Sequence, residues 1–173
     1  MEKHCLCTGI IAGHFKGKKT MVKDFDKMVE ELSEKIMEDM SKIYSKKAID
    51  YLLQPRNLGK IDDPDGYGKV KGPCGDTMEI FLKVINGKIA EANFMTDGCG
   101  TTIICGSMVT ELAKGKGIND AGKITQAFIL QNLGGLPESD QHCALLAANT
   151  FHEALKDYRL LEREPWKRVY RRI

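Results

Sequence analysis

The sequence lacks a long hydrophobic run, a secretory signal and a strong excess of charge of one sign. No stretch approaches the roughly 18 apolar residues of a membrane-spanning helix, and no apolar segment near the N-terminus is followed by a small-residue cleavage site. The net charge is +2 in 173 residues, which gives no argument for nucleic acid or a membrane surface as partner. We therefore expect a cytoplasmic protein with one main domain plus appendages.

The sequence also lacks paired cysteine motifs. It has six cysteines, but they form neither the CxxC…CxxC pattern of a zinc ribbon nor the closely spaced run of a ferredoxin. In a cytoplasmic chain, such cysteines are metal ligands, redox-active groups or buried thiols more often than disulfides. Any metal site must therefore be assembled by tertiary folding.

Three cysteines occur in turn-like settings that suit a metal site. Glycines flank Cys99 on both sides and follow Cys74 directly, while His142 precedes Cys143. Glycine lets the backbone approach a bulky ligand, and Asp76 lies two residues after Cys74. Thiolates are the soft ligands of zinc and iron–sulfur centres. Together these residues predict one metal site whose ligands are three thiolates together with a carboxylate or an imidazole.

The hydrophobic pattern divides the chain into three parts. Residues 1–20 show no period and are expected to be disordered. Residues 24–43 predict an amphipathic helix that must bury its apolar face on the domain or on a partner chain. Residues 44–160 form the main domain, beginning with a short helix capped at Ser45, and residues 161–173 form a basic tail with interleaved aromatics.

Period-2 alternation predicts a β-hairpin in the middle of the domain. Residues 77–84 alternate, Asn86-Gly87 predicts a type I′ turn, and residues 88–96 return as the partner strand. Residues 67–71 predict a third strand. In this hairpin residue i should pair with about 173 − i, so positions 76 and 97 face each other. Cys74 and Cys99 should then emerge at one end of the sheet.

Two helices are expected to follow cysteines of the predicted site. One runs from Thr101 to Ala113 directly after Cys99, and the other runs over 141–160 with Cys143 in its first turn. A helix N-terminus favours a thiolate, so both sulfurs are expected to be stabilised as anions. The fold class is α+β: a small three-stranded antiparallel sheet with helices packed on one face, plus the added N-terminal amphipathic helix.

These motifs, in this order, resemble the IscU/NifU-type iron–sulfur cluster scaffold family. The resemblance spans residues 44–158 and is carried by four segments: Tyr44-Ser45-Lys46-Lys47 through Pro55-Arg56-Asn57, Cys74-Gly75-Asp76, Asp97-Gly98-Cys99-Gly100, and Leu136-Pro137 with His142-Cys143. It implies a protein that binds iron and sulfide, builds a labile [2Fe-2S] cluster and transfers it to apo-proteins.

The resemblance also implies roles for individual residues. Cys74, Cys99 and Cys143 would be the cluster thiolates, with Asp76 or His142 as the fourth ligand. Cys143 would be the candidate persulfide acceptor, and a cysteine desulfurase or other sulfide source the donor. The helix at 24–43 is an addition to the family pattern, and its apolar face suggests a self-association surface or a cover over the cluster end.

Several alternatives remain open from the residues. Zinc could occupy the same site, as in the sulfur-accepting SufU branch, although the short interval between Cys99 and Cys143 and the presence of His142 favour the scaffold branch. Cys105 is expected to be a packed thiol, with a fourth thiolate or persulfide relay as the alternative. The family's Leu-Pro-Pro-x-Lys segment is Leu136-Pro137-Glu138-Ser139-Asp140 here. The acid in place of the lysine argues against an Hsp70-type chaperone partner. The basic tail is expected to be solvated, with Trp166 and Tyr170 packed on the domain. Contact with an acidic partner or with RNA is the lesser alternative.

Overall fold

The computed structural model describes residues 17–170, with side chains from residue 25 onward. The chain divides into two compact units at Met40–Ser41. Most of the first unit is the helix α1 (Gly17–Ile43). This helix begins seven residues before the expected Asp24, because the Lys-rich segment after Gly17 has no proline and lysine is a good helix former. Residues 17–20, for which the sequence predicts disorder, are thus part of this helix, and residues 1–16 lie outside the described residues.

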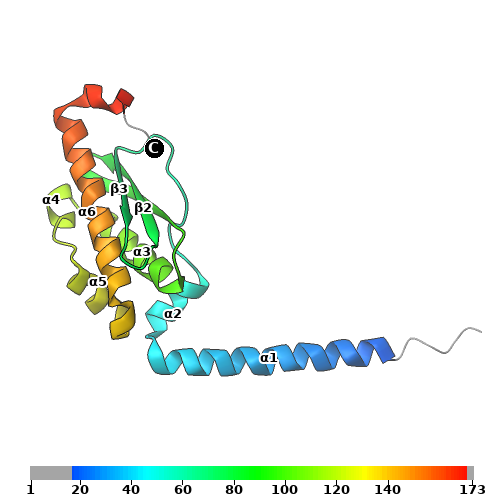
Figure 1. Cartoon of the computed structure of the whole chain (residues 1–173). Helices are drawn as coiled ribbons and strands as arrows, with labels where there is room; N and C mark the ends of the chain where they lie inside the picture. Colours follow the sequence, from blue (N-terminus) through cyan, green and yellow to red (C-terminus); the bar gives the residue numbers. More distant parts are fainter. Residues whose placement is uncertain (1–16, 171–173) are drawn as a thin grey trace, which may run out of the picture. The chain divides into compact units, whose positions relative to one another are not determined.

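The second unit is the α+β fold predicted from the sequence (Figure 1). Its sheet has the strand order β1-β2-β3, with all neighbours antiparallel. The strands are β1 (Gly66–Lys71), β2 (Thr77–Ile85) and β3 (Lys88–Thr96). The helices are α2 (Lys46–Leu53), α3 (Gly100–Ala113), α4 (Ile118–Ala121), α5 (Gln126–Leu133) and α6 (Gln141–Arg163), with short 3₁₀ helices η1 (Glu138–Asp140) and η2 (Pro165–Tyr170).

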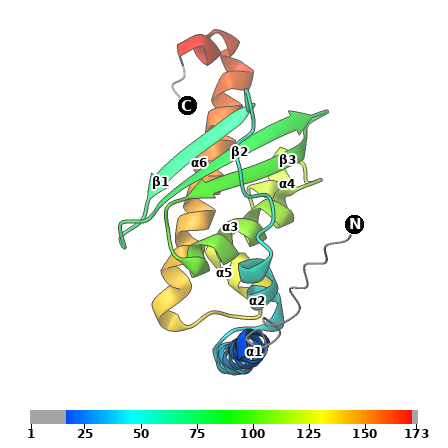
Figure 2. The ribbon, with the colours of Figure 1, turned by 90° about the vertical axis from the view of Figure 1, so that its right-hand side faces the viewer.

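The main helices cover one face of the sheet (Figure 2). α6 lies across β1 and β2, and α3 lies against β3. A Cβ added at Gly68 would lie 2.4 Å from the carbonyl oxygen of Thr150, so only glycine allows the α6 backbone to approach β1 this closely. The packing of α6 on the sheet therefore depends on this glycine, as well as on apolar contacts.

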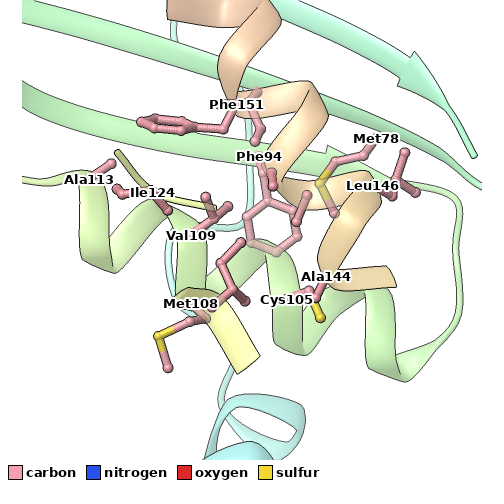
Figure 3. Close-up of a cluster of buried hydrophobic side chains, with 14 of the residues drawn as sticks. Met78, Phe94, Cys105, Met108, Val109, Ala113, Ile124, Ala144, Leu146 and Phe151 are labelled. Atoms are coloured by element: carbon pink, nitrogen blue, oxygen red, sulfur yellow. The ribbon is translucent and has the colours of Figure 1, made fainter. Parts of the chain in front are cut away.

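The buried face of the sheet and the facing sides of α3 and α6 form one core (Figure 3). Phe94 on β3 lies at its centre, and the added Cβ of Gly106 on α3 would lie 2.4 Å from the Phe94 ring. Cys105 is fully buried in this core beside Ala144. The structure thus places Cys105 where the packed-thiol interpretation expects it.

The hairpin differs from its prediction by one residue. Asn86 and Gly87 both have positive φ, as a type I′ turn requires, and Val84 pairs with Ile89 as expected. Beyond Lys83 a β-bulge shifts the register, so that Lys83 pairs with Glu91. Ala90 is the extra residue, and position 97 therefore lies beside Thr77 instead of Asp76: the Asp97 amide donates to the Thr77 carbonyl at 3.3 Å.

The ends of the domain also differ in detail from the prediction. α6 continues to Arg163, and the following tail forms η2. Arg168 anchors η2 to the loop before β1 through ion pairs with Asp63 at 2.9 Å and Asp65 at 3.2 Å. Trp166 and Tyr170 contact each other edge-to-face and remain exposed. Within the described part of the chain, no helix is both long and apolar enough to cross a membrane.

Candidate metal and cluster site

Asp76 is held against Cys99 at the start of β2. The loop before it is closed by a hydrogen bond from the Gly72 amide to the Asp76 carbonyl at 2.7 Å. Its carboxylate oxygen Oδ2 accepts from the Cys99 backbone amide at 3.3 Å and from the Thr102 hydroxyl at 2.9 Å. A Cβ added at Gly98 would lie 2.5 Å from this same oxygen. Glycine before Cys99 is therefore what permits the approach.

Cys99 is the N-cap residue of α3, and its exposed sulfur lies beside the first helical turn. Burial alone would raise the pKa of this thiol. Hydrogen bonds from the Thr102 hydroxyl and from the Thr102 and Thr101 amides outweigh that effect, and the pKa is lowered from its ordinary value. Cys99 is therefore ionised more easily than an ordinary thiol, as its position before a helix predicts.

Cys143 lies in the first turn of α6 but differs from the expectation. Its side chain is only 1% exposed, and this burial raises the pKa of the thiol to about 11. The helix N-terminus was expected to favour the thiolate here, and that expectation is wrong for the ligand-free protein, because desolvation of a charged sulfur exceeds the effect of the helix. The Cys143 thiol is thus protonated at neutral pH.

His142 presents one ring nitrogen to the site. Its Nδ1 is 2.7 Å from the Ser139 carbonyl oxygen, which can only accept, so the proton of the neutral ring is assigned to Nδ1. The unprotonated Nε2 then lies 3.5 Å from the sulfur of Cys143. This nitrogen carries the lone pair that a metal ion would use.

The fully buried hydroxyl of Thr102 connects these groups. Its Oγ1 lies 3.6 Å from the Cys99 sulfur, 3.5 Å from the Cys143 sulfur and 2.9 Å from Asp76 Oδ2. Sequence reasoning missed Thr102, although its place three residues after a candidate ligand at a helix start was a usable signal. The structure thus brings Asp76, Cys99, His142 and Cys143 together.

Cys74 approaches the same group from the loop between β1 and β2. It is exposed, and a negative charge on its sulfur would help to raise the pKa of Cys143, which places the two within electrostatic range. Within the described part of the chain, no three side chains of the metal-binding types already stand around one point. A metal ion held jointly by the predicted ligands would therefore require their side chains, that of Cys74 included, to move closer together.

A second polar cluster supports the rim without belonging to the ligand set. Asp140 accepts hydrogen bonds from the hydroxyls of Tyr44 at 2.7 Å and Thr101 at 3.3 Å. The Tyr44 hydrogen bond is the main reason why the pKa of Asp140 lies below its ordinary value. These bonds tie the start of α2 and the first turn of α3 to the residue before α6, and sequence reasoning missed them as well.

The geometry defines a class of protein in which an α+β domain carries cysteine sulfurs, a carboxylate and an imidazole at one end of its sheet. Residues 43–164 match the family model described as the NifU-like N-terminal domain. The chain belongs to this family. The structural comparisons agree with this fold.

Two of the curated relatives are named as scaffold proteins. The chain is 47% identical over 117 residues to iron-sulfur cluster assembly scaffold protein IscU 1 of Archaeoglobus fulgidus, covering 67% of this chain and 76% of that protein. It is 41% identical over 121 residues to the IscU scaffold protein of Escherichia coli K12, covering 67% and 94%.

Two solved structures share the fold. A NifU-like N-terminal protein from Brucella abortus has a TM-score of 0.55 at 17% identity and covers 70% of this chain and 97% of its own. A structure titled as a putative SUF-system scaffold protein from Fervidobacterium islandicum has a TM-score of 0.53 at 22% identity, covering 66% and 97%. At such identities the likeness concerns the fold alone.

Proposed function

We propose that this protein is an iron–sulfur cluster assembly scaffold, which binds iron and sulfide, assembles a labile [2Fe-2S] cluster and transfers it to apo-proteins. One observation carries the proposal: candidate ligands from three separate elements gather around the Thr102 hydroxyl, in a chain whose relatives are named as scaffolds. The cluster is cargo, so the protein is a carrier and performs no turnover on a small substrate.

The ligand set accounts for both assembly and release. Cys74, Cys99 and Cys143 would supply three thiolates to the cluster. Two irons bridged by two sulfides need four terminal ligands, so the fourth is the Asp76 carboxylate or the His142 imidazole. Oxygen and nitrogen bind iron less tightly here than a thiolate does. An acceptor's thiolate can therefore displace this weak ligand and begin the transfer.

The exposures of the sulfurs suggest how sulfur enters. Sulfur arrives as sulfide, or as the outer sulfur of a persulfide that the Cys143 thiolate takes from a cysteine desulfurase. In the second case an external two-electron reductant must cleave the persulfide to sulfide and the Cys143 thiolate. Because Cys143 is 1% exposed, direct delivery requires the first turn of α6 to open. Iron binding at exposed Cys99 and Cys74 needs no such opening and would come first.

The test is anaerobic reconstitution followed by metal and sulfide analysis. We expect two irons and two acid-labile sulfides per protein, with absorption and Mössbauer spectra of a [2Fe-2S] centre. Changing Cys74, Cys99 or Cys143 to Ser should abolish or weaken the cluster. Cys105→Ala is the matched control, because that thiol is fully buried in the core, where it lies beside Ala144. Asp76→Ala and His142→Ala identify the fourth ligand.

A zinc-dependent sulfurtransferase of the SufU type is the second candidate function. The same donor set of thiolates, carboxylate and imidazole suits zinc, and in that case one thiolate would carry persulfide sulfur as an enzyme intermediate. Stoichiometric zinc after expression in iron-replete cells, with no cluster after reconstitution, would establish this function and refute the scaffold.

The helix α1 supports self-association as a further part of the proposal. Val29, Ile36 and Ile43 recur every seven residues, and Phe25 and Leu32 occupy the positions four before the first two; all five are exposed. β-Branched residues at one heptad position, with mostly larger apolar residues at the other, favour a parallel two-stranded coiled coil. We therefore expect two copies of this chain to pair through α1.

Sedimentation of the full-length protein tests this pairing. Leu32→Glu should convert a dimer to a monomer, while Glu34→Gln on the opposite helix face should leave the mass unchanged. A wild-type monomer at all concentrations would refute the pairing. Apo iron–sulfur proteins and a sulfur donor remain the expected partners in either outcome. The acid at Asp140 still predicts that an Hsp70-type chaperone is not among them.

A further inference from the structure

Thr102 is not one of the candidate ligands, yet its hydroxyl lies within hydrogen-bonding distance of three of them: Asp76, Cys99 and Cys143. The side chain is fully buried. The three atoms around it belong to Asp76, which precedes β2, to the N-cap of α3 and to the first turn of α6. One small polar group therefore lies where three separate parts of the chain meet.

Other buried threonines in this protein satisfy their hydroxyls differently. Thr110 in α3 and Thr150 in α6 are also fully buried, and each donates to a carbonyl four residues earlier in its own helix, at 2.8 Å. Thr102 lies in the first turn, where the helix offers no such carbonyl. Its hydroxyl instead lies within hydrogen-bonding distance of Asp76 and of the sulfurs of Cys99 and Cys143.

A hydroxyl has a single proton, and the surroundings decide where it points. The Asp76 carboxylate is the nearest acceptor and, being charged, the strongest. While Cys99 and Cys143 are protonated thiols, the proton therefore points to Asp76 and holds the carboxylate against the Cys99 amide. When Cys99 ionises, its sulfur competes with Asp76 for this proton, which is how the Thr102 hydroxyl lowers the pKa of Cys99. If iron takes the carboxylate, the proton is released from Asp76 and the nearest remaining acceptors are the sulfurs of Cys99 and Cys143.

We propose that Thr102 is a positioning residue that holds Asp76 beside Cys99 while the site is empty and donates its hydrogen bond to a cluster thiolate once Asp76 binds iron. This inference rests on the proposed scaffold function. Hydrogen bonds to ligand sulfurs are among the determinants of a cluster's reduction potential, because they stabilise the added negative charge of the reduced form. When Asp76 binds or leaves iron, the Thr102 hydrogen bond therefore moves between Asp76 and a cluster thiolate, and the reduction potential of the cluster changes with it.

The experiment compares three variants with the wild type. Thr102→Val keeps the shape and removes the hydroxyl, Thr102→Ser keeps the hydroxyl, and Thr150→Val makes the same change at a buried site away from the ligands. In metal-free protein, hydrogen exchange of the Cys99 amide measures how firmly Asp76 is held. In reconstituted protein, a spectroelectrochemical titration gives the reduction potential, and the visible circular dichroism reports the ligand geometry.

We expect Thr102→Val to speed exchange of the Cys99 amide by at least about tenfold, the effect of losing one hydrogen bond to a charged acceptor, and to shift the reduction potential to a more negative value. Thr102→Ser and Thr150→Val should match the wild type in both measurements. Wild-type values in Thr102→Val would overturn the inference, and so would equal changes in Thr102→Ser, which would show that the methyl group matters. A wild type that forms no cluster refutes the scaffold instead, while the amide exchange still decides whether Thr102 holds Asp76.

Discussion

The two sulfurs at the helix starts should differ strongly in reactivity toward an alkylating reagent. Burial raises the pKa of Cys143 from 9.0 to about 11, which lowers its thiolate fraction at neutral pH about 100-fold relative to an ordinary thiol. The thiolate is the reactive species, and the 1% exposure of Cys143 hinders access further. Cys99 has the opposite character, since its pKa is lowered and its sulfur is exposed.

Limiting iodoacetamide applied to the metal-free, reduced protein measures this difference, with each cysteine followed by peptide mass spectrometry. We expect Cys99 to react at least 100-fold faster than Cys143 at neutral pH. The Cys143 rate should continue to rise until about pH 11, whereas the Cys99 rate should level off at a lower pH, because its pKa lies below the ordinary value. Cys105 should remain unmodified, because it is fully buried.

Unfolding the protein in guanidinium provides the control, since the rates of all cysteines should then become similar. Equal rates for Cys99 and Cys143 in the folded protein would refute the reasoning. That result would mean that the first turn of α6 is open much of the time, and it would make Cys143 directly accessible to a persulfide donor.

Three further predictions concern stability and charge. The folded protein holds the Cys143 proton more tightly than the unfolded chain, so this contribution to stability is full below pH 9 and is lost as the pH rises toward 11. Urea unfolding should show that the free energy of unfolding falls by up to about 3 kcal/mol over this range. The same dependence of the free energy of unfolding on pH in Cys143→Ala would contradict the prediction. Gly106→Ala places a Cβ 2.4 Å from the buried Phe94 ring and should lower the free energy of unfolding by about 1–3 kcal/mol. In the control Gly117→Ala the nearest atom to the new Cβ lies at 3.9 Å, so the free energy of unfolding should change by less than about 0.5 kcal/mol. Tyr44→Phe removes the donor at 2.7 Å from Asp140, so an NMR titration should show the pKa of that carboxyl rising toward its ordinary value, and no change would exclude this hydrogen bond as the cause.

Local signals in the sequence predicted most of the elements. The alternation over 77–84, the Asn86-Gly87 turn and the Ser45 cap, whose hydroxyl accepts from the Ala48 amide at 3.2 Å, all depend on residues close together in the chain. Such short-range features need no knowledge of the packing. The positions of the cysteines at the ends of elements followed from them.

The bulge could not be predicted from the alternation. Ile89 and Ala92 are both fully buried although they lie three residues apart, a spacing that breaks the period of two. Their shared burial arises because Ala90 is the extra residue and β3 must return its apolar side chains to the helices. The bulge is needed because β3 packs against the helices of the core, and the residues of the strand alone do not show that packing.

The sequence by itself determined the class of fold, the identity of the candidate ligands and their placement at the starts of β2, α3 and α6. Only the tertiary structure decided that Cys143 is buried while Cys99 is exposed, and that the Thr102 hydroxyl lies between them. The reason is physical: solvation and hydrogen bonding of a sulfur depend on which distant segments pack over it. Here that packing is set by the close approach of α6 to the glycines of β1, a contact between residues more than 80 positions apart.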